Sequence, residues 1–402
     1  MALLMPSMAM GQTAGLTLEA LVDSALSHSP RVKAAALQIE KARALKGTAF
    51  NPPFTSVTLK QETTGGGGPE NGVMFSQDFD FPTVYVGRHR LLSAKTALEQ
   101  RRFAVMASEV ETEITNAYWT AMYLAELLAL NDSLQVRLQE FCRVASVRLE
   151  QGESSKLELI NAERVAEKYR MERTALQLRY DAQLSELQRL AGCAEPFTLA
   201  REPLRPVEIG TVDNYDYFST LAGLSNIEEL RVAEREVALA KNEFLPGISI
   251  GATVQALIKS FNPYHIERLP FEKGNFMGFE VGLSVPLFFG SNSARVKAST
   301  IESRISRLNM EAEEDRAVAE VERLKAAMQT LSASLDGFRT SSLPRAHEIM
   351  RLAEVSYTLG EIDYIEYISN VETAYDVYRE HLQCLDDYNH TAVALKRLMT
   401  CP

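Results

Sequence analysis

Few residues of this sequence are spaced for catalysis or for holding a metal ion. His381 and Cys384 stand one helical turn apart, which is a spacing that a transition metal can use. Such a pair is far more often ordinary helix surface or packing, so we expect no metal site. The four cysteines, which also include Cys142, Cys193 and Cys401, contain no C-x-x-C pair. Neither a zinc site nor a disulfide framework is therefore indicated.

Motifs for nucleotide binding and hydrolysis are missing from the sequence. It contains no G-x-x-x-x-G-K-[ST], no H-E-x-x-H and no G-x-S-x-G. The glycine run at residues 65–68 lies between two expected strands rather than before a helix, so a phosphate cradle is not favoured. We expect neither an enzyme nor a bound cofactor.

Two matching stretches carry the more informative charged residues. RLEQGESSKLELI occupies residues 148–160, and SYTLGEIDYIEYI occupies residues 356–368. When Gly152 is placed over Gly360, the offset is 208 residues, and the same offset aligns LQRLAGC with LKRLMTC further along the chain. Self-similarity of this kind predicts an internal duplication.

Composition limits the classes of protein that fit. The chain has 402 residues, of which 46% are hydrophobic and 24% charged, and this is typical of globular proteins. The net charge of −11 argues against a nucleic-acid partner. No run of 18 apolar residues predicts a transmembrane helix, but spanning β-strands leave a much weaker trace in a sequence.

The first residues resemble the end of a secretory signal peptide. MALLMPSMAMGQ is apolar, and Ala9 and Gly11 provide the small residues of a cleavage site before Gln12. The basic segment that begins such a signal is missing, so either the true start lies upstream or this is an ordinary apolar terminus. We interpret residues 1–11 as the remnant of a signal peptide.

The first repeat, residues 12–195, is predicted to follow the order helix, hairpin, long helix, returning helix. Thr17 is the expected N-cap of a helix that Pro30 divides. The predicted elements are a helix at 17–49, a hairpin at 54–82 with its loop at 63–72, a long helix at 88–151 and a returning helix at 153–191.

The second repeat, residues 213–402, follows a proline-rich connector at 196–212 and has the same order. Pro344 is expected to bend or restart its long helix. The predicted elements are a helix at 226–244, a hairpin at 247–288 with its loop at 259–275, a long helix at 291–359 and a returning helix at 361–400.

The predicted strands alternate between apolar and polar side chains. Val73, Phe75 and Phe79 share one face of their strand, while Ser76 and Asp78 share the other. The strands have about the 9–11 residues that a membrane-spanning strand needs. Four strands cannot close a barrel, and open edges are not tolerated in lipid. Closure must come from other copies, which predicts a homo-oligomeric β-barrel continued by a helical tube.

The duplicated plan, the prolines before each hairpin and the two glycine turns followed by L-E-L and I-E-Y resemble the TolC-type outer-membrane efflux protein family. In its general sequence features the chain is similar to the branch of this family that is paired with heavy-metal and multidrug RND pumps. The resemblance implies a mainly α fold with a small β part. It implies two structural repeats of long coiled-coil helices plus a β-hairpin, and a trimer with a 12-stranded β-barrel and an α-helical periplasmic tunnel.

The same resemblance implies the function and the partners. The expected protein is an outer-membrane efflux duct that works as a homotrimer in outer-membrane lipid, with an extended periplasmic domain. Its expected partners are a periplasmic membrane-fusion adaptor and an inner-membrane RND-type pump. The resemblance also places the adaptor-docking tip at Gly152, Gly360, Leu157 and Ile365, with the hairpin loops 63–72 and 259–275 on the outside.

The resemblance further implies a gate of acidic residues at the tip. Glu366 stands six positions after the second-turn glycine, where family members narrow the closed mouth, and Glu158 matches it in the first turn. A second family acid is replaced here by Ser369, and Glu372 is a candidate substitute. A ring of carboxylates repels anions and attracts cations at a constriction. The alternative is that these charges simply face water, as most charges on long helices do.

A tyrosine latch is the other feature that the resemblance implies. Tyr357 matches the family tyrosine that helps to hold the tip closed. The resemblance implies a basic partner two residues after the second-turn glycine, but this sequence has Ile362 there. Lys156, two residues before Glu158, is the substitute candidate.

Two other readings compete with the duct. A soluble coiled-coil scaffold has no reason to keep an apolar strand face twice at spanning length, and an enzyme lacks a catalytic constellation. The cargo, whether metal ions, drugs or other small molecules, does not follow from the sequence, because selectivity in such systems belongs to the pump.

Overall fold

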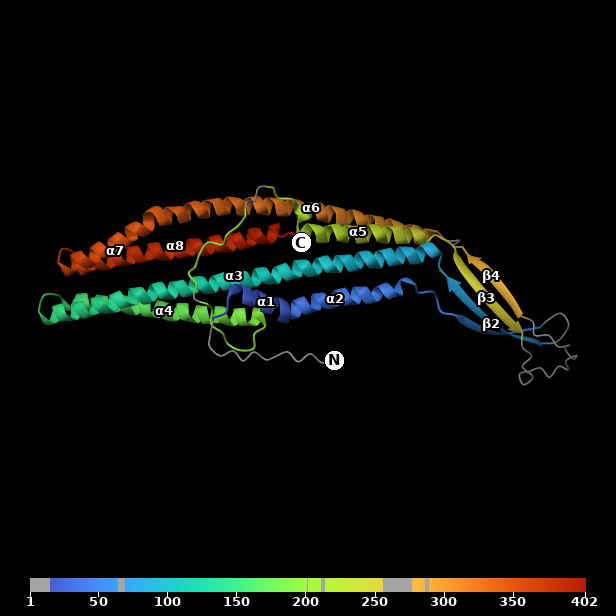
Figure 1. Ribbon diagram of the computed structural model, residues 1–402, viewed down its shortest axis with the longest axis horizontal. Coiled ribbons are helices and arrows are strands. Elements are labelled where there is room, and N and C mark those ends of the chain that lie inside the picture. The colour runs from blue at the N-terminus through green and yellow to red at the C-terminus, as the bar shows by residue number, and fades with distance from the viewer. Residues whose placement is uncertain (1–14, 64–68, 201, 211–213, 256–276, 286–288) are drawn as a thin grey trace. The chain divides into compact units, whose positions relative to one another are not determined.

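The computed structural model describes residues 15–63, 69–200, 202–210, 214–255, 277–285 and 289–402 (Figure 1). The predicted signal-peptide remnant at 1–11 and the predicted loop at 259–275 therefore lie outside the described residues. The chain forms two compact units. Unit 1 holds the described residues up to Ala35 with Phe103–Ala222 and Glu314–Pro402, and unit 2 holds Ala36–Arg102 and Gly223–Glu313. Each unit thus contains parts of both sequence repeats.

Unit 2 contains a four-stranded antiparallel sheet in the order β1-β2-β3-β4. Cross-strand pairing places Phe75 opposite Val57 on one side and opposite Ala252 on the other, and Ala252 faces Phe279. Residues directly opposite one another share a face of the sheet. The strands are β1 (Ser56–Thr63), β2 (Pro69–Phe79), β3 (Gly247–Gln255) and β4 (Met277–Ser284).

One face of this sheet is therefore apolar across all four strands, and the other is polar. Phe279 is 89% exposed and Val281 is 70% exposed, so the apolar face is open in the single chain. On the polar face the Glu280 side chain lies against Gly251, where an added Cβ would be only 2.7 Å from Glu280 Cγ. Ser249 Oγ lies still closer to the position of an added Cβ at Gly282 on that face. The predicted alternation is present, and small residues make room for the polar side chains.

The first hairpin differs from the prediction at both its loop and its end. Strand β2 already begins at Pro69, so the loop is shorter than the predicted 63–72. Helix α3 (Pro82–Glu150) begins six residues before the predicted start at 88. Pro82 fits the first helical position, because proline needs no N–H partner there. Gly87 is helical rather than a breaker: an added Cβ would be 3.3 Å from Leu239 of the neighbouring helix α5 (Leu221–Asn242).

Long helices make up the rest of unit 2 and pass on into unit 1. Helix α2 (Pro30–Lys46), α3 and α6 (Gly290–Gly337) contribute residues to both units. An ion pair of 2.8 Å joins Lys95 of α3 to Glu236 of α5 within unit 2. Helix α5 begins five residues before the predicted 226, at Leu221.

Two antiparallel helix pairs dominate unit 1. Helix α4 (Lys156–Ala191) returns beside α3, and α8 (Tyr364–Met399) returns beside α7 (Leu343–Thr358), as Figure 1 shows. Helix α1 (Leu18–His28) packs against α3 and α4. Its predicted N-cap is confirmed, since Thr17 Oγ1 accepts a hydrogen bond from the Ala20 N–H, and the predicted break at Pro30 follows its end. Fully buried Leu21, Ile114 and Leu187 belong to this core.

Both glycine turns are confirmed. Gly152 has a φ of 76° and Gly360 a φ of 75°, which is the left-handed region that favours glycine. The returning helices begin three residues later than the predicted 153 and 361, at Lys156 and Tyr364. The reason is capping. The Ser155 side chain accepts from the Glu158 N–H, and Asp363 accepts from the Glu366 N–H, so the capping residues remain outside the helices.

The second long helix is interrupted where Pro344 predicts a bend. Helix α6 ends at Gly337, a π-helical turn follows at Phe338–Ser342, and α7 begins at Leu343 with the proline in its first turn. Proline removes one backbone N–H and displaces the carbonyl four residues earlier, and a widened turn accommodates this. The predicted helix at 291–359 is therefore three segments.

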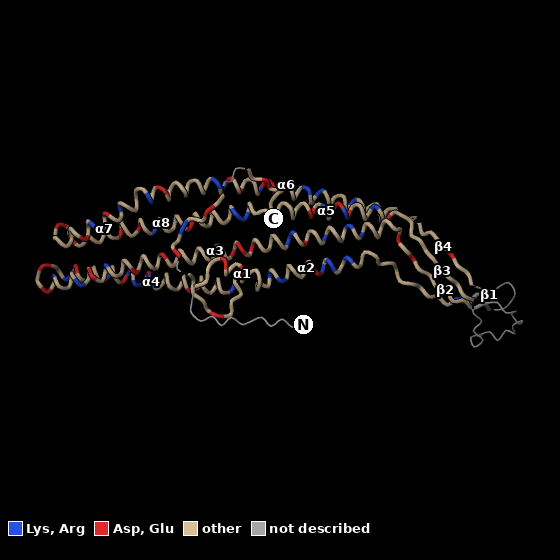
Figure 2. The backbone as a smooth tube through the Cα atoms, viewed as in Figure 1, with Lys and Arg blue, Asp and Glu red and all other residues tan. Residues whose placement is uncertain are grey.

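The helices carry charges of both signs along their lengths (Figure 2). Many are paired one turn apart, as in Glu140 with Arg143 and Glu348 with Arg351. Among the residues that the structure describes, no helix has the length and apolar character to cross a membrane.

Candidate functional site at the helical tip

Three aromatic rings form the centre of the tip of unit 1. The Tyr357 ring lies 5.3 Å from the Phe141 ring and 4.8 Å from the Tyr367 ring, measured between centroids. Phe141 belongs to α3, Tyr357 to α7 and Tyr367 to α8, and all three are buried. Their packing joins the α3–α4 pair to the α7–α8 pair.

A buried hydrogen bond lies beside these rings. The Tyr357 hydroxyl donates to Glu158 Oε1 at 2.9 Å. Only 6% of Tyr357 and 8% of Glu158 is exposed. Arg148 Nη1 is 4.0 Å from the same carboxylate oxygen, and the Arg148 guanidinium lies 5.5 Å from the centre of the Tyr357 ring. We call Arg148, Glu158 and Tyr357 the latch cluster; it connects α3, α4 and α7.

The surroundings of Tyr357 keep its hydroxyl protonated. Burial, followed by the hydrogen bond to Glu158, raises the pKa of Tyr357 to about 12, and Arg148 opposes this shift. A raised tyrosine pKa means that the proton stabilises the folded contact. The donor is therefore present at every physiological pH, and the contact is lost only as the pH rises toward 12.

The contacts of Tyr357 differ from those predicted from the sequence. Its hydroxyl donates to Glu158, which the sequence placed with the gate. Lys156, the predicted basic partner, is exposed and forms no ion pair with any described residue. Arg148 supplies the positive charge instead. The duplication gives no signal for Arg148, because the residue aligned with it is Ser356.

The other predicted tip residues lie at the surface. Glu366 is exposed in the first turn of α8. Leu157 is 62% exposed and Ile365 is 61% exposed, at matched positions of the two turns. These residues are accessible to solvent or to a partner in the single chain. Their assignment to a gate and to a docking surface stays a prediction.

Glu372 forms a second tie between the helix pairs. Its Oε1 accepts hydrogen bonds from Lys168 Nζ at 2.9 Å and from the Tyr169 hydroxyl at 3.1 Å. Burial, together with the charge of Glu372, raises the pKa of Tyr169. Both donors belong to α4 and the acceptor to α8. The sequence singled out Glu372 but gave no signal for these two partners.

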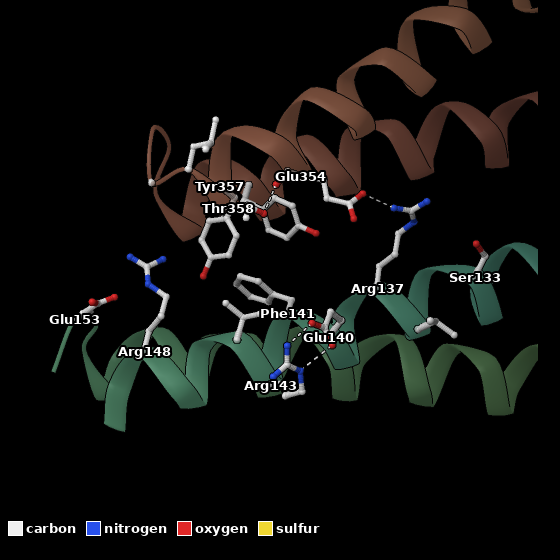
Figure 3. A pocket seen from close by; sticks show the side chains of 15 residues that line it. Ser133, Arg137, Glu140, Phe141, Arg143, Arg148, Glu153, Glu354, Tyr357 and Thr358 are labelled. Atoms are coloured by element: carbon white, nitrogen blue, oxygen red, sulfur yellow. Dashed lines mark hydrogen bonds and ion pairs between the residues drawn. The ribbon is translucent and has the colours of Figure 1, made fainter. Parts of the chain in front are cut away.

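A groove of about 990 Å³ opens beside the latch cluster, between α3 and α7 (Figure 3). Arg137 of α3 and Glu354 of α7 form an ion pair of 2.9 Å across it. Arg148 rises from α3 toward Tyr357, and Phe141 lies between them and the ion pair (Figure 3). The groove thus has an aromatic floor and a charged rim.

The described residues include no cluster of three or more histidine, cysteine or acidic side chains that is suited to a metal ion. His381 packs edge-on against Phe338 at 5.7 Å between centroids, and Cys384 Sγ lies 3.8 Å from the Leu331 carbonyl oxygen.

What the tip offers is a set of hydrogen bonds and ion pairs between two helix pairs. Such ties can hold the pairs together and release them.

Comparisons with known proteins agree with this architecture. Residues 226–400 match the family model described as outer membrane efflux protein. No curated protein sequence matches the chain. Among solved structures, the channel protein CusC has a TM-score of 0.79 at 17% identity, covering 98% of this chain and 96% of its own.

Two further solved structures have the same fold. A membrane protein from Pseudomonas aeruginosa has a TM-score of 0.79 at 17% identity and covers 99% of both chains. The CmeC outer membrane channel of Campylobacter jejuni has a TM-score of 0.75 at 15% identity, covering 98% of this chain and 90% of its own. The fold of almost the whole chain is thus that of these solved structures, and residues 226–400 match the family model of the outer membrane efflux proteins.

Proposed function

We propose that the chain is an outer-membrane export duct that works as a homotrimer. The observation that carries this proposal is the sheet. Its apolar face is exposed in the single chain, its opposite face is polar, and β1 and β4 leave two open edges. An exposed apolar face of this kind marks a surface that another molecule or lipid covers.

Three copies placed edge to edge supply twelve strands and leave no open edge. The apolar face then lies against lipid, and the polar face, with Asp78 and Glu280, lines a water-filled lumen. A soluble scaffold gives no reason for such a sheet. The proposal accounts for both the alternation and the open edges.

The tip of unit 1 is the proposed mouth of the duct on the periplasmic side. In the closed state the latch cluster and the Lys168–Glu372 pair hold the α7–α8 pair against the α3–α4 pair. Opening requires these contacts to separate, and a partner that binds the separated arrangement better shifts the equilibrium toward it. Exposed Glu366 contributes one carboxylate per copy at the constriction.

The partners and the cargo belong to the same proposal. A periplasmic adaptor contacts the tip around Gly152, Leu157, Gly360 and Ile365, and it links the duct to an inner-membrane pump of the RND type. The pump supplies the energy and selects the cargo, so the duct itself carries out no reaction. The branch that serves heavy-metal and multidrug pumps is the one we propose.

A deletion strain tests this function. Loss of the protein is expected to increase susceptibility to the cargo of its pump, and the wild-type protein supplied in trans restores resistance. The protein is expected in the outer-membrane fraction. Unchanged susceptibility across metals, dyes and antibiotics, together with recovery of the protein in the soluble fraction, contradicts the proposal.

A further inference from the structure

A polar cluster lies between α3 and α8, away from the tip. His390 of α8 is at its centre, with Nδ1 3.0 Å from Asn116 Oδ1 and Nε2 3.0 Å from Thr120 Oγ1. Nε2 is also 3.4 Å from Asp386 Oδ1. Both ring nitrogens of one histidine therefore face oxygen atoms, and two of these partners belong to the other helix.

This arrangement suits the doubly protonated ring. A neutral imidazole donates from one nitrogen only, whereas the imidazolium donates from both. Asp386 is buried, its Oδ1 accepts no conventional hydrogen bond from the described residues, and His390 Nε2 lies 3.4 Å from that oxygen. A buried carboxylate oxygen without a donor is costly. A proton on His390 removes that cost and satisfies Asn116 at the same time.

The charges around the ring all act in the same direction. Asp386 and Asp387, both on α8, are the charged groups that act on His390, while α3 faces it with the uncharged Asn116 and Thr120. The nearby Asp386 carboxylate raises the pKa of His390, against a smaller opposing effect of burial. The neighbouring Tyr123 of α3 is held separately, by donating to Gln383 Oε1 at 2.7 Å.

We propose that His390 is a proton-dependent tie between α3 and α8. With the proton bound, one ring joins Asn116 on α3 to Asp386 on α8. Without this proton only one ring nitrogen can donate a hydrogen bond. Either the contact with Asp386 then weakens or the Asn116 amide must rotate. Helix α8 also carries Glu366 and Tyr367 of the tip, so this tie fixes the helix that must move when the duct opens. This role in regulation rests on the proposed function, but the tie itself does not.

The sign of the pH dependence follows from the raised pKa. A histidine whose folded-state pKa lies above its usual value, near 6.5, stabilises the contact fully below that usual value. The stabilisation is lost as the pH rises through the folded-state pKa. The tie is therefore strong in acid and weak in alkali.

Amide hydrogen exchange of the full-length protein in detergent tests the proposal. Protection factors, corrected for the intrinsic pH dependence of exchange, are compared at about pH 5.5 and about pH 8.5 for peptides around residues 112–124 and 383–393. In the wild type we expect several-fold higher protection at the acidic pH. His390→Gln should remove this difference, and Asp386→Asn should move the transition to lower pH.

His347→Gln is the matched control, because His347 is exposed on α7. It should retain the wild-type pH dependence in the same peptides. Equal protection of the wild type at both pH values, or a pH dependence that persists in His390→Gln, overturns the tie. Because exchange is measured on purified protein, this result is independent of whether the protein exports anything.

Discussion

At the scale of single residues, the latch cluster is the most tightly defined feature of the tip. It places a phenol, a carboxylate and a guanidinium from three helices within contact of one another, with the acceptor and the donor almost completely buried. Buried polar groups of this kind are costly to break one at a time. The cluster is therefore suited to keep one arrangement of the helix pairs until a stronger contact replaces it.

Removing the Tyr357 hydroxyl should weaken this arrangement. Tyr357→Phe leaves the buried Glu158 carboxylate without its hydrogen-bond donor, which costs about 1–3 kcal/mol. We expect a higher mean conductance of the reconstituted duct, because the tip opens more often. Tyr378→Phe is the control, since the Tyr378 hydroxyl forms no hydrogen bond with described residues. Equal conductance of Tyr357→Phe and the control contradicts a latch.

Glu366 should act through charge rather than through packing. Its side chain is exposed, so Glu366→Ala is expected to leave the thermal unfolding temperature almost unchanged. If three copies form a carboxylate ring, the same change raises conductance and reduces the preference for cations. Bilayer recordings with asymmetric salt measure both. Unchanged conductance and selectivity remove Glu366 from the constriction.

The sequence predicted some of these residues and not others for physical reasons. Tyr357, Glu158 and Glu366 lie at fixed distances from two glycines, so an alignment with the family finds them. Arg148 and Lys168 act through contacts between helices whose relative rotation no local pattern encodes. Burial of Glu158 also depends on that packing, which is why the sequence placed it with the gate, whereas in the structure it is buried and accepts a hydrogen bond from Tyr357.

At the scale of elements, the glycine turns show how little sequence is needed to reverse a long helix. Both glycines have positive φ, and nothing lies within 4 Å of where a Cβ would be added. Any penalty for substitution is therefore a backbone penalty. The helix starts were predicted three residues early, because periodicity continues through the capping residues Ser155 and Asp363.

Alanine at either turn should destabilise the tip by about 1–2 kcal/mol through strain in the left-handed conformation. Gly152→Ala and Gly360→Ala are compared with Gly337→Ala, which has ordinary helical φ and the same open surroundings. The control should be neutral or stabilising by about 0.5–1 kcal/mol. Thermal unfolding measures the difference. A Gly152→Ala protein as stable as the control contradicts the argument from strain.

One buried side chain makes two hydrogen bonds to the backbone of the connector between the repeats. Fully buried Asn389 accepts from the Val207 N–H at 2.8 Å and donates to the Arg205 carbonyl at 3.0 Å. Asn389→Ala leaves both backbone groups without a partner, and we expect cleavage of the connector by a protease at a lower concentration. Asn389→Asp retains the acceptor and should have an intermediate effect. Equal cleavage of all three proteins contradicts the anchoring role.

At the scale of the whole molecule, the four-stranded sheet leaves its apolar face and the outer edges of β1 and β4 uncovered in the single chain. The register places Leu59 of β1 and Val281 of β4 on the apolar face, with β2 and β3 between them. Period-two alternation was enough to predict this face from the sequence. The need for further copies of the chain was predicted only from the open edges of the sheet. Pairing between strands of different copies leaves no local pattern in the sequence.

The central claim is that three copies close the sheet, and chemical cross-linking of its two edges tests it most directly. In a variant whose four native cysteines are replaced, Leu59→Cys and Val281→Cys are introduced together, and membranes are treated with a bifunctional thiol reagent. We expect a ladder of products that ends at three chains, and no ladder for either cysteine alone. Single chains only, or a ladder that continues beyond three, contradicts it.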